Sequence, residues 1–115
     1  MPLTDNQSRE RIRDLNDGFR KTLDPALGRV MLTAGVDALP SEVRARAIQK
    51  VAAFDNFAAG NDPHGEHDFG GMVVDGETVL FKIDYYDPTL ESGSEDPADP
   101  TKTTRVLTLM LAAEY

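Results

Sequence analysis

The densest group of potentially reactive side chains is the segment 61–68, Asn-Asp-Pro-His-Gly-Glu-His-Asp, which holds both histidines of the chain. Imidazole and carboxylate groups can bind a transition metal ion or transfer protons near neutral pH. However, the spacing of His64 and His67 matches no established metal signature, and the Pro-x-Gly context disfavours a helix. We favour a tight turn whose carboxylates accept backbone N–H bonds. A metal or catalytic site and a partner-binding loop are the alternatives.

A second group of charged side chains lies in the predicted strands. Lys82, Asp84 and Arg105 are expected on one face of the sheet, with Asp84 pairing across strands with either base. His67 packed beside Asp84 would form a His–Asp pair, in which the carboxylate fixes the histidine tautomer. No motif positions a serine nucleophile, and the chain has no cysteine. We therefore assign no catalytic residue and expect no cofactor.

The sequence predicts two helices that position these groups. Thr4 and Gln7 match a capping box, and apolar residues then recur at helical spacing over about five turns, up to Asp24-Pro25. A second amphipathic helix of about 13 residues follows Pro40. The basic residues between the apolar stripes are expected to face solvent: Arg9, Arg11, Arg13, Arg20, Lys21, Arg44, Arg46 and Lys50.

Four strands are predicted, one between the helices and three after them. Residues 29–34 are a short β-prone run, and residues 72–74 and 78–86 flank Asp75-Gly76, a strong two-residue hairpin signal. The last run, residues 103–111, is apolar on both faces, which is typical of a central strand covered on both sides. The order α-β-α-β-β-β predicts an α+β fold in which two helices pack on an antiparallel sheet of about four strands.

Length and composition restrict the protein class. The 115 residues suit one domain, residues 1–115, with one modest core. The absence of cysteine excludes disulfides and the usual structural zinc sites, and it fits a cytoplasmic location. No apolar run approaches the roughly 20 residues that cross a bilayer, and no basic aromatic patch indicates direct nucleic-acid binding.

The acidity of the chain is concentrated in one part of it. Residues 55–100 hold twelve acidic residues and one basic residue, a net charge of −11, whereas the whole chain carries −8. Such a field repels nucleic acid and favours a basic partner or a cation. A solvated acidic surface that keeps the protein soluble is the alternative interpretation.

Four stretches of the sequence are distinctive: residues 15–21 (LNDGFRK), 61–70 (NDPHGEHDFG), 82–87 (KIDYYD) and 104–115 (TRVLTLMLAAEY). On these stretches the chain resembles a family of small bacterial proteins of unknown function. The resemblance implies a stand-alone cytoplasmic domain, often carried on mobile elements. It implies no established activity or catalytic residue.

These observations lead to a favoured hypothesis. The protein is expected to be a small acidic interaction domain that inhibits a bacterial nuclease or defence complex. An anti-CRISPR protein would be an inhibitor of this kind. Its partner would offer a basic, nucleic-acid-binding surface. The candidate contact residues are Asp62, Glu66, Asp68, Asp87, Glu91, Glu95, Asp96 and Asp99.

Two further hypotheses are kept. One is a metal-dependent hydrolase that uses His64, Glu66, His67 and Asp68, with help from Asp84. The other is an adaptor or homodimer, in which a second subunit covers the last strand.

Overall fold

The first helix, α1 (Asp5–Thr22), begins at the predicted capping box in the computed structural model, which describes residues 3–115. The Thr4 hydroxyl accepts a hydrogen bond from Gln7 N (3.1 Å), and the Gln7 side chain accepts one from Thr4 N (2.9 Å). Leu23, in the left-handed conformation (φ 52°), caps the C-terminal end of α1 just before Asp24-Pro25.

The elements that follow include one helix that the sequence did not predict. In chain order they are β1 (Gly28–Leu32), α2 (Ala34–Asp37), α3 (Ser41–Ala53), β2 (Phe69–Val74), β3 (Glu77–Tyr86), the 3-10 turn η1 (Pro100–Lys102), β4 (Thr104–Leu111) and the 3-10 turn η2 (Ala112–Glu114). The two predicted helices are α1 and α3, but the count of two is not exact, because the chain leaves the strand at Thr33 and begins the short helix α2 at Ala34. The Thr33 hydroxyl caps this short helix, and Glu114 accepts hydrogen bonds from Thr33 Oγ1 (2.7 Å) and Gly35 N (3.0 Å).

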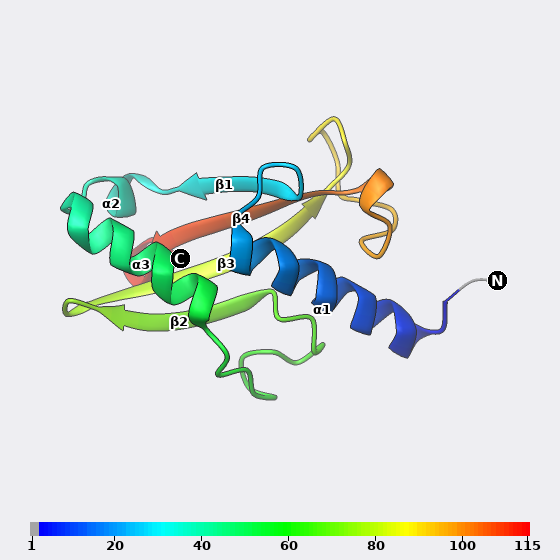
Figure 1. Cartoon of the computed structure of the whole chain (residues 1–115), viewed down its shortest axis with the longest axis horizontal. Coiled ribbons are helices and arrows are strands. Elements are labelled where there is room, and N and C mark those ends of the chain that lie inside the picture. The colour runs from blue at the N-terminus through cyan, green and yellow to red at the C-terminus, as the bar shows by residue number, and fades with distance from the viewer. Residues whose placement is uncertain (1–2) are drawn as a thin grey trace.

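The sheet has the strand order β1-β4-β3-β2 and is mixed (Figure 1). β2–β3 and β3–β4 are antiparallel, but β1 pairs with β4 in parallel, so the prediction of an all-antiparallel sheet was wrong. After β1 the chain passes through α2 and α3 to the opposite edge of the sheet, which leaves the place beside β1 for β4. β4 is thus a central strand, as its apolar sequence predicts.

Helices α1 and α3 cover one face of the sheet (Figure 1). The core between the two layers consists of Phe19, Val36, Ala47, Val51, Val74, Val79, Phe81, Ile83, Leu107 and Leu109. The side chains of β3 alternate between the two faces of the sheet, and Val79, Phe81 and Ile83 are buried in this core. Gly70 is required in β2, because a Cβ there would lie 2.5 Å from the Phe54 ring and 2.6 Å from the Phe81 ring.

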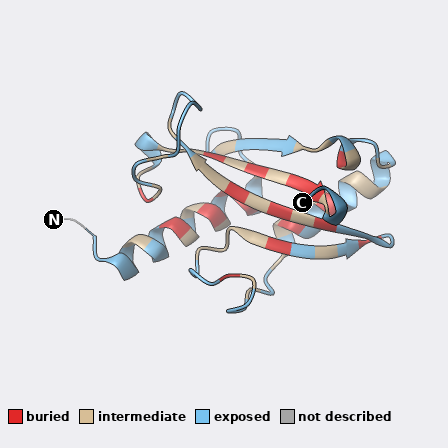
Figure 2. Ribbon diagram, turned by 180° about the vertical axis from the view of Figure 1, so that it is seen from behind, coloured by how far each residue is buried: buried red, intermediate tan, exposed pale blue. Residues whose placement is uncertain are grey.

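The second face of the sheet is only partly covered (Figure 2). Met110 is buried there, but Val106 is only half-buried, and Met31 and Val73 are exposed. Tyr115 folds back over this face and packs edge-to-face on Phe69, with ring centroids 5.7 Å apart. The expected cover on both sides of the last strand is therefore complete on the helical side only. Across residues 3–115, no helix has the length and apolar character needed to cross a membrane.

Candidate functional site

A network of polar side chains, which we call the polar network, lies between α1 and the sheet. Its members are Asn16, Asp17 and Arg20 of α1, Asp62, Glu66 and His67 of the loop before β2, Tyr85 of β3 and Arg105 of β4. Each of the four distinctive stretches of the sequence contributes at least one member. The network therefore joins segments that are as many as 89 residues apart in the chain.

Asn16 is the centre of the polar network and is 0% exposed. Its Nδ2 donates to Glu66 O (3.0 Å) and to the Tyr85 hydroxyl (2.8 Å), and its Oδ1 accepts from Arg105 Nε (2.7 Å). The Tyr85 hydroxyl in turn donates to Glu66 Oε1 (2.8 Å). Burial strongly raises the pKa of Tyr85, so the hydroxyl keeps the proton that it donates.

Arg20 is 1% exposed, so the expectation that it faces solvent was wrong. Its Nη1 donates to the carbonyl oxygens of Val51 (2.8 Å) and Phe54 (2.8 Å) at the end of α3, and its Nη2 pairs with Asp17 Oδ1 (3.0 Å). Its guanidinium carbon lies 5.3 Å from the centroid of the Phe57 ring. Arg20 therefore fastens α1 to the C-terminal end of α3, where helix carbonyl groups lack partners.

The segment 61–68 is a tight turn, as the favoured interpretation of the sequence states. Asp62 Oδ1 accepts hydrogen bonds from Glu66 N (3.0 Å) and His67 N (3.1 Å). These bonds hold His67 at φ 57°, a conformation that is uncommon outside glycine. The His67 ring stacks on Phe57 at 3.9 Å, and its Nδ1 lies 3.0 Å from Asp17 Oδ1.

The two histidines have different surroundings. His67 is packed inside the polar network, with Nε2 3.7 Å from Asp62 Oδ2. His64 is exposed and lines a shallow depression together with Asp68 and Asp84. Within residues 3–115, no three histidine, aspartate or glutamate side chains are grouped to hold one ion. The candidate ligands His64 and His67 therefore belong to no such group within residues 3–115.

Lys82 and Asp84 lie on the partly covered face of the sheet, whereas Arg105 lies on the helical face. Lys82 Nζ pairs with Asp84 Oδ2 at 2.9 Å along one strand, so the expected cross-strand pair was wrong. Arg105 is 3% exposed and faces Tyr85 in the register of β3 and β4. His67 contacts Asp17 and Asp62, and the His–Asp84 pair considered for it does not form.

Three of the eight candidate contact residues, Asp62, Glu66 and Asp68, are at least partly buried. Asp62 is 8% exposed, and its carboxylate is occupied by backbone N–H groups. Glu66 and Asp68 are partly buried, and Glu66 is bonded to Tyr85. Burial, and then the neighbouring Glu66 carboxylate, raises the pKa of Asp68.

The other five candidates, Asp87, Glu91, Glu95, Asp96 and Asp99, lie in the segment between β3 and β4, residues 87–99, which we call the acidic loop. Its first part is closed by the hydrogen bonds Asp87 N to Ser92 O (2.8 Å) and Ser94 N to Tyr85 O (3.0 Å). Its second part is held by two arginines. Arg11 Nε donates to Ala98 O (2.9 Å), and Arg105 Nη2 donates to Pro97 O (2.5 Å). The loop is thus attached to both α1 and β4.

Four of the five carboxylates of the acidic loop form no ion pair within the part of the chain that the structure describes. Within residues 3–115, Glu95 is the one that does, with Lys102 at 3.4 Å, and both side chains are exposed. Thr89 and Thr101 donate hydrogen bonds to Asp87 and Asp99, and these bonds lower the pKa of both carboxyl groups. Arg11 and Arg105 contact backbone carbonyl groups of the loop, and within residues 3–115 they form no ion pair with its carboxylates.

Sequence reasoning missed the members of the polar network on α1 and the buried position of Arg105. A signal for Arg105 exists, because it alternates in phase with Leu107 and Leu109, which form the core. Asn16 lies four residues after Ile12 and four before Arg20, on the buried side of α1. Its polar side chain, however, predicts a position facing solvent.

A comparison with protein-family models shows the family to which the chain belongs. Residues 32–114 match the family model described as protein of unknown function (DUF3768). No curated protein and no solved structure matches the chain. The matched region contains the segment 61–68, the acidic loop and the whole sheet apart from the first four residues of β1. Since it covers well over half of the sequence, the chain belongs to the DUF3768 family, whose function is unknown.

Proposed function

We propose that the protein is an interaction domain that binds a basic surface of a partner protein through the acidic loop. More specifically, we propose an inhibitor of a bacterial nuclease or defence complex, carried by a mobile element. The observation that carries the proposal is the combination of an anchored backbone and free carboxylates in the acidic loop, within the described residues 3–115. Its backbone is fastened by Arg11 and Arg105, while four of its five carboxylates have no ion-pair partner within residues 3–115.

Fixed negative charge favours this kind of binding. The loop carries five carboxylates and no basic residue. Surfaces that bind nucleic acid present lysine and arginine at positions that match phosphates, and carboxylates are attracted by the same field. A loop that is already ordered loses less conformational entropy on binding than a flexible acidic tail does. The proposal therefore predicts an affinity that depends on both salt and loop charge.

The test uses the full chain as bait in a lysate of the native host. The loop variant reverses three exposed carboxylates of the acidic loop: Glu91→Lys, Glu95→Lys and Asp96→Lys. The matched control reverses three exposed carboxylates elsewhere, with the same change in net charge: Asp37→Lys, Asp55→Lys and Glu77→Lys. We expect a protein that is captured by the wild type and the control and is lost from the loop variant.

The affinity of the purified complex then decides whether the binding is electrostatic. We expect it to weaken at least about tenfold between about 50 and 300 mM salt. An affinity that is the same in both salts, or the same for the wild type and the loop variant, contradicts the proposal. For the inhibitor role, the wild type must displace nucleic acid from the captured partner, and the loop variant must not.

A further inference from the structure

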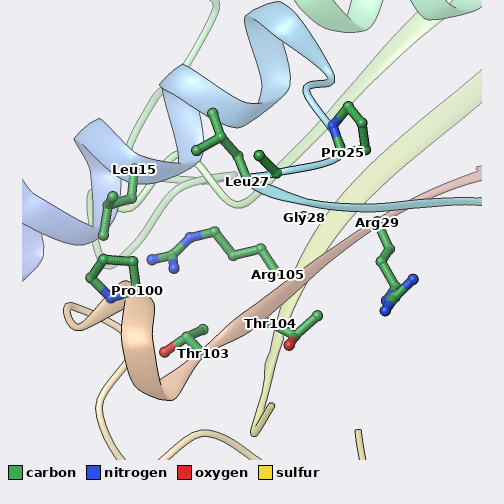
Figure 3. Close-up of a pocket in the computed structure, with 10 residues that line it drawn as sticks. Leu15, Pro25, Leu27, Gly28, Arg29, Pro100, Thr103, Thr104 and Arg105 are labelled. Carbon is green, nitrogen blue, oxygen red and sulfur yellow. The ribbon is translucent and has the colours of Figure 1, made fainter. Parts of the chain in front are cut away.

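A cavity of about 220 Å³ lies beside the buried end of Arg105 (Figure 3). Its walls come from α1, from the turn before β1 and the start of β1, from η1, and from the start of β4. Figure 3 shows the Arg105 guanidinium between Leu15 of α1 and Pro100 of η1. None of the ten residues that line the cavity carries a carboxylate.

Arg105 has hydrogen-bond donors that the protein does not use. Its Nε donates to Asn16 and its Nη2 to Pro97 O, but Nη1 has no hydrogen-bond partner within residues 3–115. No carboxylate in that range lies within 4.0 Å of the guanidinium, although the residue is 3% exposed. A guanidinium stays charged in proteins, and a buried charge is costly unless an opposite charge or strong acceptors compensate it. Arg105 therefore offers a cationic donor to an acceptor that enters the cavity.

The remaining walls define the other features of the occupant. Leu15, Pro25, Leu27 and Pro100 supply apolar surface opposite and around the guanidinium (Figure 3). Arg29 also lines the cavity, but it pairs with Val106 in the sheet, so its side chain points to the other face and away from the Arg105 guanidinium (Figure 3). Pockets for drug-sized ligands measure roughly 300–1,000 Å³, and an apolar cavity of about 150 Å³ holds benzene. The space thus suits one ring or a short chain that bears one anionic group.

We propose that this cavity binds a small organic carboxylate, with its carboxylate on Arg105 and its apolar part against Leu15 and Leu27. A planar carboxylate matches the two-pronged geometry of a guanidinium. The cavity and the acidic loop share Arg105, which donates to Pro97 O, but their proposed ligands carry opposite charges, and Ala26 lines the cavity without belonging to the loop. The site therefore does not depend on the proposed function, and each can fail without the other.

The test is a titration of the ¹⁵N-labelled full chain with benzoate, followed by NMR. We expect the Arg105 Nε–Hε resonance and the amides of residues 26–28 and 103–105 to shift, with a dissociation constant on the order of 0.1–1 mM. Benzamide, which has the same shape without the charge, should bind at least about tenfold more weakly. No shift at these positions up to about 20 mM benzoate overturns the proposal, as does equal binding of benzamide.

Two substitutions locate the site. Arg105→Lys should weaken benzoate binding at least about tenfold, but it also removes bonds to Asn16 and Pro97. Ala26→Phe is therefore the second variant, because Ala26 is exposed, lines the cavity and makes no side-chain hydrogen bond. It should abolish binding, whereas Ala113→Phe, at an exposed position outside the cavity, should leave it unchanged. Wild-type affinity in Ala26→Phe, or tighter binding of inorganic phosphate than of benzoate, contradicts the site as proposed.

Discussion

Replacing Asn16 by alanine removes the centre of the polar network, and its cost can be worked out from the contacts. The side chain is fully buried and makes three hydrogen bonds, to Glu66 O, the Tyr85 hydroxyl and Arg105 Nε. Each bond between neutral groups contributes roughly 1 kcal/mol, and the bond from the charged Arg105 roughly 1.5–3 kcal/mol. The substitution also leaves Glu66 O and Arg105 Nε without these partners. We therefore expect a loss of about 3–5 kcal/mol from the free energy of unfolding.

Urea unfolding followed by circular dichroism measures this loss. Asn6→Ala is the matched control, because Asn6 lies exposed on the same helix and makes no side-chain hydrogen bond within residues 3–115. It should change the stability by less than about 0.5 kcal/mol. A loss below about 1 kcal/mol for Asn16→Ala would refute the reasoning, because water would then have replaced all three bonds at little cost.

Two further predictions concern the same region. Arg20→Met should lower the free energy of unfolding in urea by about 2–4 kcal/mol, because it leaves the carbonyl groups at the end of α3 and the Asp17 carboxylate without their donor. The stability of Arg20→Lys should lie between those of the Met variant and the wild type. A Met variant as stable as the wild type would contradict the anchoring role. Asp68→Asn should stabilise the fold at pH 7 by up to about 1 kcal/mol, because the raised pKa of Asp68 means that its charged form is disfavoured in the folded state. The protonated form of Asp68 contributes stability to the wild type at acidic pH, and this contribution is lost as the pH rises through the folded-state pKa of Asp68. The advantage of the Asn variant should therefore vanish towards acidic pH. An advantage that grew as the pH fell would contradict this explanation.

Local features of the fold were predictable because their signals lie within a few residues. The capping box of Thr4 and Gln7 forms as predicted, and the hairpin at Asp75-Gly76 has both residues at positive φ (50° and 84°). Side chains alternate along β3, so Tyr85 and Tyr86 lie on opposite faces of the sheet, and Tyr86 is exposed. These elements depend on backbone preferences and side-chain period, which a single sequence displays.

The polar network was not predictable for a physical reason. A buried polar residue is stable only through its partners, and the partners of Asn16 lie 50, 69 and 89 residues away. Charge alone therefore placed Arg20 on the surface, and it grouped Arg105 with Lys82 and Asp84 on one face of the sheet. The parallel pairing of β1 with β4 was missed because each strand's pattern is compatible with either direction.

The candidate contact surface was predicted in part. Asp87, Glu91, Glu95, Asp96 and Asp99 do lie in one loop, which their closeness in the sequence indicates. Asp62 is buried because its carboxylate closes a turn, a role that the same turn-forming sequence also predicted. Whether the acidic loop binds a partner stays a prediction.

The order of the acidic loop in solution tests the account most directly, because the proposed function depends on a fixed loop backbone. ¹⁵N relaxation of the free protein reports this order for the amides of Glu91–Asp96 and Ala98–Asp99. The hydrogen bonds from Arg11 and Arg105 predict order parameters near about 0.85, as in the sheet. Values below about 0.6 across these residues would show a flexible acidic segment and would contradict a preformed binding surface.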